Sequence, residues 1–307
     1  MRRQEESMTL RTLNQELLGD REFWNGKKAD LPRFDRQGCR IRSICFSAGR
    51  MAFGHTGDIL QDILDADPSA GRPDFEKASG VIMEPSYDDI KKYEDMKLRI
   101  LNMSHSLIAG IGVLLGYRGR YGICRAMQDP DITALISRII AIVQQTIENP
   151  KKMDCGRFAA DSLERLRNPN IPDDPMRIAL NGSTKMKPRF MDTWFAGKKA
   201  GLSDAELDAV LLPVAGYLRY TLGIDDDGRS FGLEDDPLKD RLASCGRNAK
   251  LGDPASAAAF RELIASPSVM GADLYAFGTI GARLQEMTGG MLEGTGAVRS
   301  AVRKSLR

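Results

Sequence analysis

The stretch from residue 93 to residue 117 constrains the fold of this chain more than any other. Its apolar residues recur every three or four positions, which is the period of a helix with one apolar face. Ser86 and Asp89 precede the stretch with the spacing of a helix cap, and a second acidic residue, Asp88, suits the positive end of the helix dipole. We therefore expect one long helix, with the rest of the chain organised around it.

Three polar side chains interrupt this helix: Lys97, Asn102 and His105, spaced K-x4-N-x2-H. At about 100° per residue, Lys97 falls inside the apolar arc, with His105 about 80° and Asn102 about 140° away. Burial disfavours the ammonium form, so the pKa of Lys97 should fall and its amine should serve as a base near neutral pH. Alternatively, Lys97 extends its charged end to solvent, and Asn102 and His105 are ordinary polar residues with satisfied hydrogen bonds.

Charge and cysteine content exclude several classes of partner. The 44 basic and 42 acidic residues nearly cancel, which gives no indication of a nucleic acid or an acidic membrane as partner. The longest apolar run, residues 107–117, is shorter than the roughly 20 residues that span a bilayer. The N-terminus lacks the apolar core of a secretory signal, and none of the five cysteines forms C-x-x-C, so we expect a reduced, cytoplasmic protein. With two histidines and no Cys/His cluster, we expect no metal.

Residues 96–105, M-K-L-R-I-L-N-M-S-H, resemble the long-chain mannitol dehydrogenase family, which carries M-K-L-R-x-L-N-x-x-H. That family includes fructuronate, mannonate and tagaturonate reductases and other polyol and sugar-acid oxidoreductases that work without zinc. The resemblance implies that Lys97 is the general base and that Asn102 and His105 hold the reacting oxygen and orient the substrate. It further implies NAD or NADP as the cofactor and a small polyol or sugar acid as the substrate.

A second segment resembles the family's R-I-x-x-N-S-S-x-K-L-P-x-R. The positions that keep this pattern are Arg177, Ile178, Asn181, Ser183, Lys185 and Arg189. Gly182 replaces the first serine, and the proline comes one position late, at Pro188. By the resemblance, Arg177, Lys185 and Asn181 bind the substrate, and clustered arginine and lysine do suit hydroxyls or a carboxylate. Without the resemblance, a solvated basic turn is the simpler interpretation.

A third segment, residues 217–238, resembles the family's W-x-R-Y, D-x-x-G and D-P-L motifs, with Tyr217 in place of the tryptophan. Downstream of residue 117 the pattern is nearly all helical. Helices are expected at residues 132–148, 156–167, 202–222, 254–264 and 273–287, and the basic tail from residue 297 is expected to fray. The glycines at 110, 112 and 116 favour close helix packing over a phosphate-binding loop.

The N-terminal part matches the family less well. Residues 41–46 have strand composition, residues 47–49 form a turn and residues 56–64 suggest a helix, which is how a dinucleotide-binding domain begins. Of the family's opening pattern G-x-G-x-F-x-R-x-H, only Gly49 and His55 match as candidate cofactor-binding residues. The segment that begins at Gly71 lies after the whole nucleotide domain in the family. Since each βαβ unit takes about 30 residues, most of that domain is expected to be missing.

The expected fold class is mainly α: a multi-helical C-terminal dehydrogenase domain, residues 71–307, preceded by a short α/β remnant of a Rossmann domain, residues 1–70. Two functions remain open. The chain is a working NAD(P)-dependent oxidoreductase with Lys97 as its general base. Alternatively, it is a catalytically inactive truncated relative, a substrate-side or self-association domain that cannot bind cofactor alone. A face without its nucleotide domain would be uncovered near Lys97, which predicts a tendency to self-associate through that face.

Overall fold

The computed structural model describes residues 44–47, 50–53, 81–84 and 86–307, which fall into two compact units. The first unit contains the described residues up to Glu94 together with Asn149–Met153. The second contains Asp95–Glu148 and Asp154–Arg307. The predicted boundary at residue 70, the predicted helix at residues 56–64, and the candidates Gly49 and His55 lie outside the described residues.

The first unit holds a three-stranded sheet in the order β1–β2–β3. β1 (Ile44–Ser47) pairs antiparallel with β2 (Arg50–Phe53), which pairs in parallel with β3 (Val81–Met83). The strand expected over residues 41–46 is confirmed in part by β1, but it is followed by β2, a strand that was not predicted. A connection of two residues is long enough to join antiparallel strands, whereas a dinucleotide-binding unit crosses over through a helix.

α5 (Tyr87–Met96) begins where the cap was predicted. The Ser86 hydroxyl accepts a hydrogen bond from the Asp89 amide at 3.2 Å and donates one to the Asp89 carboxylate at 2.9 Å. Farther along α5, the Tyr93 hydroxyl donates to Glu84 at 2.7 Å and accepts from the Lys152 amide at 3.3 Å. These bonds tie residues 149–153 to α5 within the first unit.

The helix continues directly into η3 (Lys97–Asn102), α6 (Met103–Leu107) and η4 (Ile108–Gly112). The long helix predicted over residues 93–117 is therefore confirmed in its main part, and it ends near Gly116, whose φ of +89° only glycine adopts easily. The segments η3 and η4 are π-helical, which was not predicted. Because a π-turn contains more residues than an α-turn, the angles predicted between Lys97, Asn102 and His105 do not hold.

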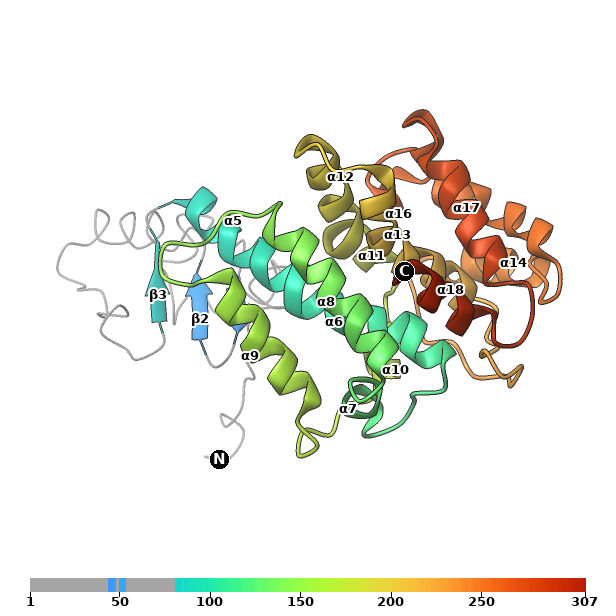
Figure 1. The fold of residues 1–307 in the computed structure, drawn as a ribbon, viewed down its shortest axis with the longest axis horizontal. Helices are drawn as coiled ribbons and strands as arrows, with labels where there is room; N and C mark the ends of the chain where they lie inside the picture. The colour runs from blue at the N-terminus through green and yellow to red at the C-terminus, as the bar shows by residue number, and fades with distance from the viewer. Residues whose placement is uncertain (1–43, 48–49, 54–80, 85) are drawn as a thin grey trace, which may run out of the picture. The chain divides into compact units, whose positions relative to one another are not determined.

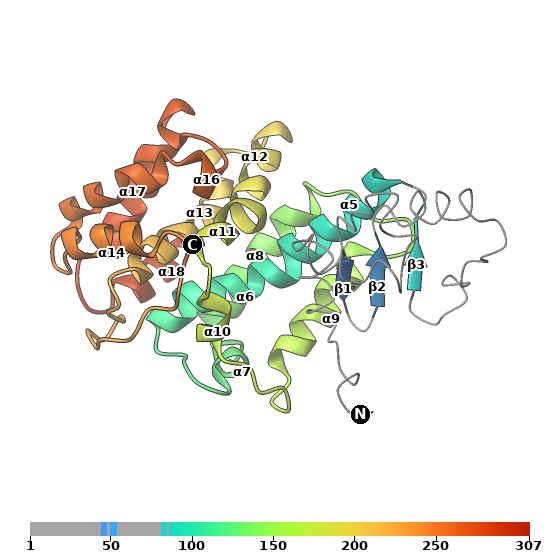
Figure 2. The ribbon, with the colours of Figure 1, turned by 180° about the vertical axis from the view of Figure 1, so that it is seen from behind.

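α13 (Asp204–Tyr220) is the central helix of the second unit. All its residues from 209 to 220 are buried, as expected of a helix that is apolar on every side. It packs against α8 (Pro130–Gln144), α12 (Asp192–Lys199), α17 (Ile280–Gly290), α18 (Ala297–Ser305), η4 and η5 (Lys187–Met191). Figures 1 and 2 show α13 among these helices from opposite sides. Gly216 of α13 lets η4 approach closely, since a Cβ there would lie 2.7 Å from the Ile111 side chain.

The other elements of this unit are also helical, and the prediction of a mainly α fold is confirmed. They are α7 (Gly122–Ala126), α9 (Cys155–Arg167), α10 (Pro175–Ala179), α11 (Ser183–Met186), α14 (Lys239–Asn248), η6 (Pro254–Phe260), α15 (Arg261–Ile264), α16 (Pro267–Met270) and η7 (Leu274–Ala276). Local caps set several of their starts. Asp129 caps α8 and Asp154 caps α9, while Ser203 and Glu206 form a complete capping box on α13.

The C-terminal tail does not fray as predicted, because it forms α18. Val298 and Val302, one turn apart, are fully buried. The Asp226 carboxylate accepts hydrogen bonds from the Val298 amide at 2.8 Å and the Arg299 amide at 3.0 Å, and so caps this helix. The cap comes from a residue 72 positions earlier, so a search for local capping residues does not find it.

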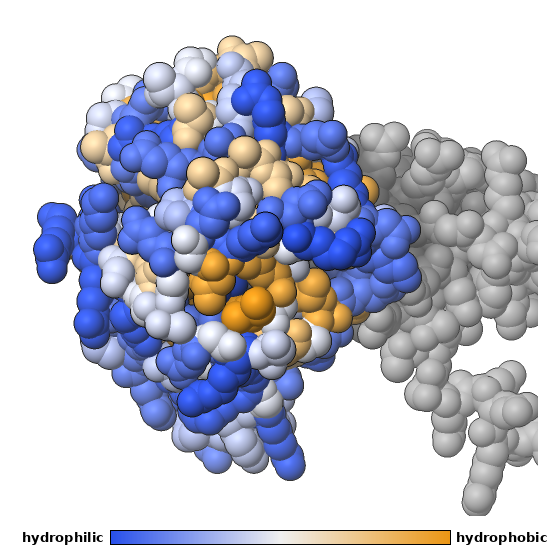
Figure 3. All heavy atoms as spheres, turned by 90° about the vertical axis from the view of Figure 1, so that its right-hand side faces the viewer, coloured by the Kyte–Doolittle hydropathy of each residue, from blue (hydrophilic) through white to orange (hydrophobic). Residues whose placement is uncertain are grey.

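On the face drawn in Figure 3, hydrophilic residues surround a group of hydrophobic ones near the centre. Among the described residues, the large apolar side chains that are well exposed are Tyr121, Ile171, Leu180, Leu233 and Phe277. Within the described part of the chain, no helix has the length and apolar character needed to cross a membrane.

Candidate active site

Lys97 is the first residue of η3 and is partly buried, next to the buried Ile100 and Leu101. η3 packs against α8, α9 and η5, so the backbone that carries Lys97 is enclosed by other helices. π-helical turns are rare and occur often at functional sites. The irregular turn at Lys97 is therefore a structural feature that agrees with the motif found in the sequence.

Arg189 of η5 fixes the end of η3, where Asn102 lies. Its guanidinium donates to the Asn102 carbonyl at 3.1 Å and to the Ser106 hydroxyl at 2.6 Å. Burial lowers the pKa of Arg189 to about 10. The second motif thus contacts the first through the backbone of Asn102. Sequence analysis placed Arg189 in that motif but did not select it as a site residue.

His105 follows on α6, and its side chain is 18% exposed. Its Nδ1 lies 3.0 Å from the Leu101 carbonyl, which favours the tautomer with the proton on Nδ1. Its Nε2 lies 3.8 Å from the Asp173 carboxylate. Burial lowers the pKa of His105, the charges of Arg189 and Arg165 act in the same direction, and Asp173 opposes them. His105 is therefore neutral at pH 7, with Nε2 able to accept a proton or a hydrogen bond.

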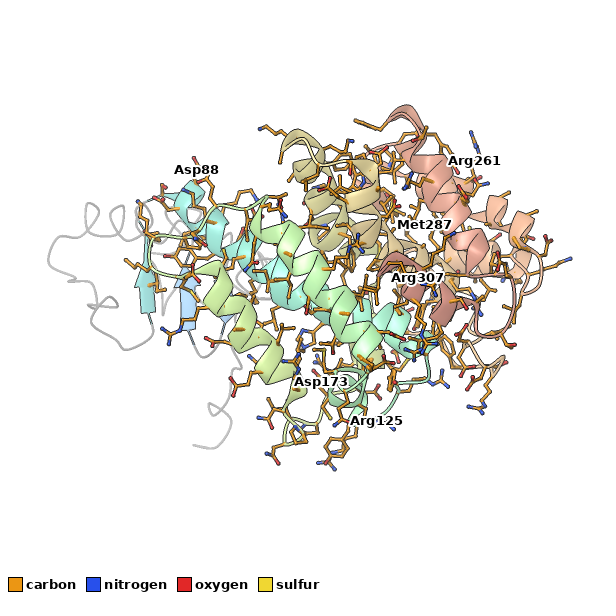
Figure 4. The ribbon with its side chains drawn as sticks, in the orientation of Figure 1. Asp88, Arg125, Asp173, Arg261, Met287 and Arg307 are labelled. Atoms are coloured by element: carbon orange, nitrogen blue, oxygen red, sulfur yellow. The ribbon has the colours of Figure 1, made fainter. Side chains whose placement is uncertain are left out.

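Arg177 of α10 is 67% exposed, and its guanidinium is bound to Asp173. Nη2 donates to both carboxylate oxygens, at 2.8 and 3.0 Å, and Nε donates to one of them at 3.1 Å. Asp173, labelled in Figure 4, lies on the segment that joins α9 to α10. One carboxylate thus connects His105 of the first motif with Arg177 of the second. Sequence analysis missed Asp173, although it belongs to the polar loop before Arg177.

Lys185 and Asn181 shape the turn after α10. The Lys185 amine donates to the Ile178 carbonyl at 2.6 Å and also to the Leu180 carbonyl. Burial, with the charges of Arg189 and Arg177, lowers the pKa of Lys185 to about 8. Asn181 is exposed and adopts a left-handed backbone with φ of +55°. Both predicted substrate residues therefore hold the backbone of this turn in its present conformation.

Two departures from the family pattern lie in contact with each other. A Cβ on Gly182 would come within 2.5 Å of the Tyr217 ring, so the glycine makes room for that tyrosine. The Tyr217 hydroxyl lies 3.5 Å from the Asp236 carboxylate, which also accepts from the Ser183 amide at 2.8 Å and hydroxyl at 2.5 Å. Burial and the charge of Asp236 raise the pKa of Tyr217. Tyr217 therefore requires a residue without a side chain at position 182.

The third motif contains a buried arginine that binds the backbone of two loops. Arg219 is fully buried, and its guanidinium donates to the carbonyls of Met291 at 3.1 Å, Ile224 at 2.7 Å and Asp225 at 3.4 Å. Asp225 in turn accepts from Arg118 at 2.8 Å. These groups join the loop after α13 to the segment after α17.

Neither a metal-binding group nor the strand, turn and helix of a dinucleotide-binding unit is found among the described residues. No group of three or more His, Cys, Asp or Glu side chains able to hold a metal ion occurs in the part of the chain that the structure describes. The described strands do not supply the strand, turn and helix that bind a dinucleotide phosphate, because β1 is followed by β2. Two surface hollows, of about 490 and 1030 Å³, contain none of the candidate residues.

Comparison with known proteins gives consistent matches. The family model of the mannitol dehydrogenase C-terminal domain matches residues 89–273. A D-mannonate oxidoreductase of Thermotoga maritima is 33% identical over 244 residues, which cover 78% of this chain and 44% of that protein. A mannitol 2-dehydrogenase of Aspergillus terreus is 31% identical over 197 residues, which cover 62% of this chain and 37% of that protein. The chain spans less than half the length of these curated relatives.

Solved structures support the fold. The mannitol 2-dehydrogenase of Pseudomonas fluorescens, in a ternary complex with NAD and D-mannitol, superposes with a TM-score of 0.63 at 24% sequence identity. The match covers 76% of this chain and 44% of that one. The helical arrangement around α13 is therefore one that occurs in a solved dehydrogenase.

Proposed function

This chain belongs to the mannitol dehydrogenase family, and we propose that it forms the substrate side of an NAD(P)-dependent, zinc-independent oxidoreductase. The reaction interconverts a polyol or sugar acid and the corresponding ketose or keto-acid. One observation carries the proposal. The carboxylate of Asp173 lies between His105 of the first motif and Arg177 of the second, which supports one site formed by both motifs.

Each side chain has a role that its surroundings support. Lys97, partly buried, accepts the proton of the reacting hydroxyl. Asn102 and the neutral His105 form hydrogen bonds to the reacting oxygen and orient it. Arg177 and Asn181, both exposed, contact the remaining hydroxyls or a carboxylate. The Lys185 ammonium uses two donors on backbone carbonyls and keeps a third N–H for the substrate.

This function requires NAD or NADP, which when bound would supply the hydride acceptor. A second candidate function is favoured by the arrangement of the described strands, which do not form a dinucleotide-binding unit. β1 pairs with β2 where a dinucleotide-binding unit has a helix. The second candidate is an inactive relative that keeps the substrate-side residues and self-associates. Ile171 and Leu180, 38% and 37% exposed, flank Arg177 in the sequence and give such a surface apolar side chains.

Calorimetric titration of the full chain with NAD⁺ and NADP⁺, each in the presence of D-mannonate or D-mannitol as the hydride donor, separates the two candidates. A working enzyme binds one cofactor and turns over, and Lys97→Ala lowers the rate by about 10²- to 10⁴-fold, the usual contribution of a general base. Lys91→Ala, an exposed lysine on α5, is the matched control and leaves the rate unchanged. Absence of cofactor binding at millimolar concentration supports the inactive relative and contradicts the oxidoreductase.

A further inference from the structure

The carboxylate of Asp173 contacts two side chains that the proposed function assigns to the substrate. It accepts three hydrogen bonds from Arg177, at 2.8, 3.0 and 3.1 Å, and one of its oxygens lies 3.8 Å from His105 Nε2. Arg177 belongs to α10 and His105 to α6, so the carboxylate joins two helices that are far apart in the sequence. A substrate that binds both side chains must share them with Asp173 or displace it.

The backbone around Asp173 is held on both sides. The Asp173 carbonyl accepts a hydrogen bond from the Ile123 amide at 3.3 Å. The carboxylate of Asp174 accepts the amides of Met176 at 3.0 Å and Gly119 at 3.1 Å. The side chain of Asp173 remains 15% exposed, so it can turn aside while its backbone stays in place.

The contact with Arg177 has the geometry of a bound ligand. A carboxylate held by two parallel N–H groups of a guanidinium is the arrangement by which arginine recognises carboxylates in general. Because the Arg177 guanidinium is 67% exposed, solvent weakens its attraction to Asp173, and a carboxylate from outside can reach it and take the place of Asp173. Arg189 differs, because it is only partly exposed and donates to a backbone carbonyl and a buried serine hydroxyl.

We propose that Asp173 is a placeholder for the substrate's carboxylate and thereby sets the choice between sugar acids and polyols. The inference rests on the proposed function. A sugar acid must displace one negative charge from Arg177 before its own carboxylate binds there. A neutral polyol needs only hydrogen bonds and can bind beside the intact pair of Asp173 and Arg177. Asp173 therefore weakens the binding of acids selectively.

The test compares D-mannonate with D-mannitol, titrated calorimetrically into the full chain and its Asp173→Asn variant. The variant should bind D-mannonate about three- to fivefold more tightly, as expected for removal of one exposed competing charge, and D-mannitol within about twofold. Asp161→Asn, which removes one negative charge from an exposed position on α9, is the control and should change neither affinity. Arg177→Lys keeps the charge without the two-pronged geometry and should weaken D-mannonate.

The ring of His105 supplies a readout that does not need turnover. The chain has only two histidines, so His55→Gln assigns the His105 resonance by NMR. Asp173 raises the pKa of His105 against burial, Arg189 and Arg165, so Asp173→Asn should lower that pKa further.

Each outcome of the test decides a separate point. If Asp173→Asn lowers the His105 pKa but leaves the ratio of the D-mannonate and D-mannitol affinities unchanged, the placeholder proposal is overturned. Asp173 and Arg177 are then a structural ion pair. An unchanged His105 pKa also overturns it, because Asp173 would then not face the ring in solution. Failure of both proteins to bind either ligand rejects the proposed function itself.

Discussion

Two clusters of charged side chains in the second unit occur in segments that resemble the same family, yet their charges are held differently. In the His105 cluster (His105, Asp173 and Arg177), the arginine is 67% exposed and binds only a side-chain carboxylate among the contacts described. In the Arg219 cluster (Arg118, Arg219, Asp225 and Asp226), the central arginine is fully buried and binds three backbone carbonyls.

The difference shows why a sequence motif does not by itself mark a binding residue. A buried guanidinium is out of reach of a ligand. If it moved towards one, the backbone carbonyls that it binds would lose their hydrogen-bond donor, which costs free energy. An exposed guanidinium on a carboxylate loses little when a ligand's carboxylate replaces that partner. We therefore propose that the Arg219 cluster stabilises the fold and that the His105 cluster binds a ligand, and four measurements test this contrast.

The largest effect is expected for Arg219→Met. It removes the donors of buried carbonyls, including those of Met291 and Ile224, and should lower the free energy of unfolding by about 3–5 kcal/mol. Urea unfolding followed by circular dichroism measures the change. Arg177→Met is the matched control and should cost about 0.2–1 kcal/mol, as for other exposed pairs. Equal losses in the two variants would remove the distinction between the clusters.

Asp226→Ala should have the next largest effect. Its carboxylate accepts the amides of Val298 and Arg299 at the start of α18, and loss of such a cap costs about 1–2 kcal/mol. Hydrogen exchange should accelerate at the amides of α18 before it does so in α13. Asp227→Ala, at an exposed neighbouring position, serves as the control. If α18 kept its protection in the Asp226 variant, the buried valines and the ion pairs of Arg299 and Arg303 with Asp131 would be enough to hold the tail.

Lys185→Gln tests a residue whose burial lies between that of Arg219 and that of Arg177. Its amine bonds two carbonyls at the end of α10 but is only partly buried, so the loss should be about 0.5–1 kcal/mol. Lys187→Gln, at an exposed lysine paired with Asp192, is the nearby control. A loss as large as that of Arg219→Met would place Lys185 with the structural cluster and contradict its role at the substrate.

The smallest effect is a pH dependence from His105. Burial lowers its pKa below the value of 6.5 that it has in the unfolded chain, so below pH 6.5 the unfolded state binds more protons. This contribution to stability is complete above pH 6.5 and is lost as the pH falls towards the lower, folded pKa. Urea midpoints measured between pH 7.5 and about pH 5, where histidine charges, should fall less in His105→Gln than in wild type. Identical curves would mean that the ring is not buried in solution.

Much of the helical framework could be predicted from short-range patterns. The helix around Lys97, the cap at Ser86 and the capping box at Ser203 all depend on residues within one or two turns of each other. The match to the family also rests on short segments. Such features can be recognised in a sequence because the hydrogen bonds and apolar contacts that form them join residues close together in the chain.

Contacts between distant segments could not be predicted in that way. Asp173 meets His105 across 68 positions, and Asp226 caps α18 across 72. The π-helical turns η3 and η4 also escaped prediction, because they change the number of residues per turn without altering the apolar pattern much. The pairing of β1 with β2 was not predicted either.

The sequence alone determined that this is a helical member of the mannitol dehydrogenase family with Lys97, Asn102 and His105 on one helix, because periodicity, caps and motifs are local. Only the tertiary structure decided which charged residues stay available to a ligand. Arg177 and Arg219 look equally important in the sequence, but packing buries one among backbone carbonyls and leaves the other exposed on a carboxylate. Burial depends on which helices meet, and that is set by the whole fold.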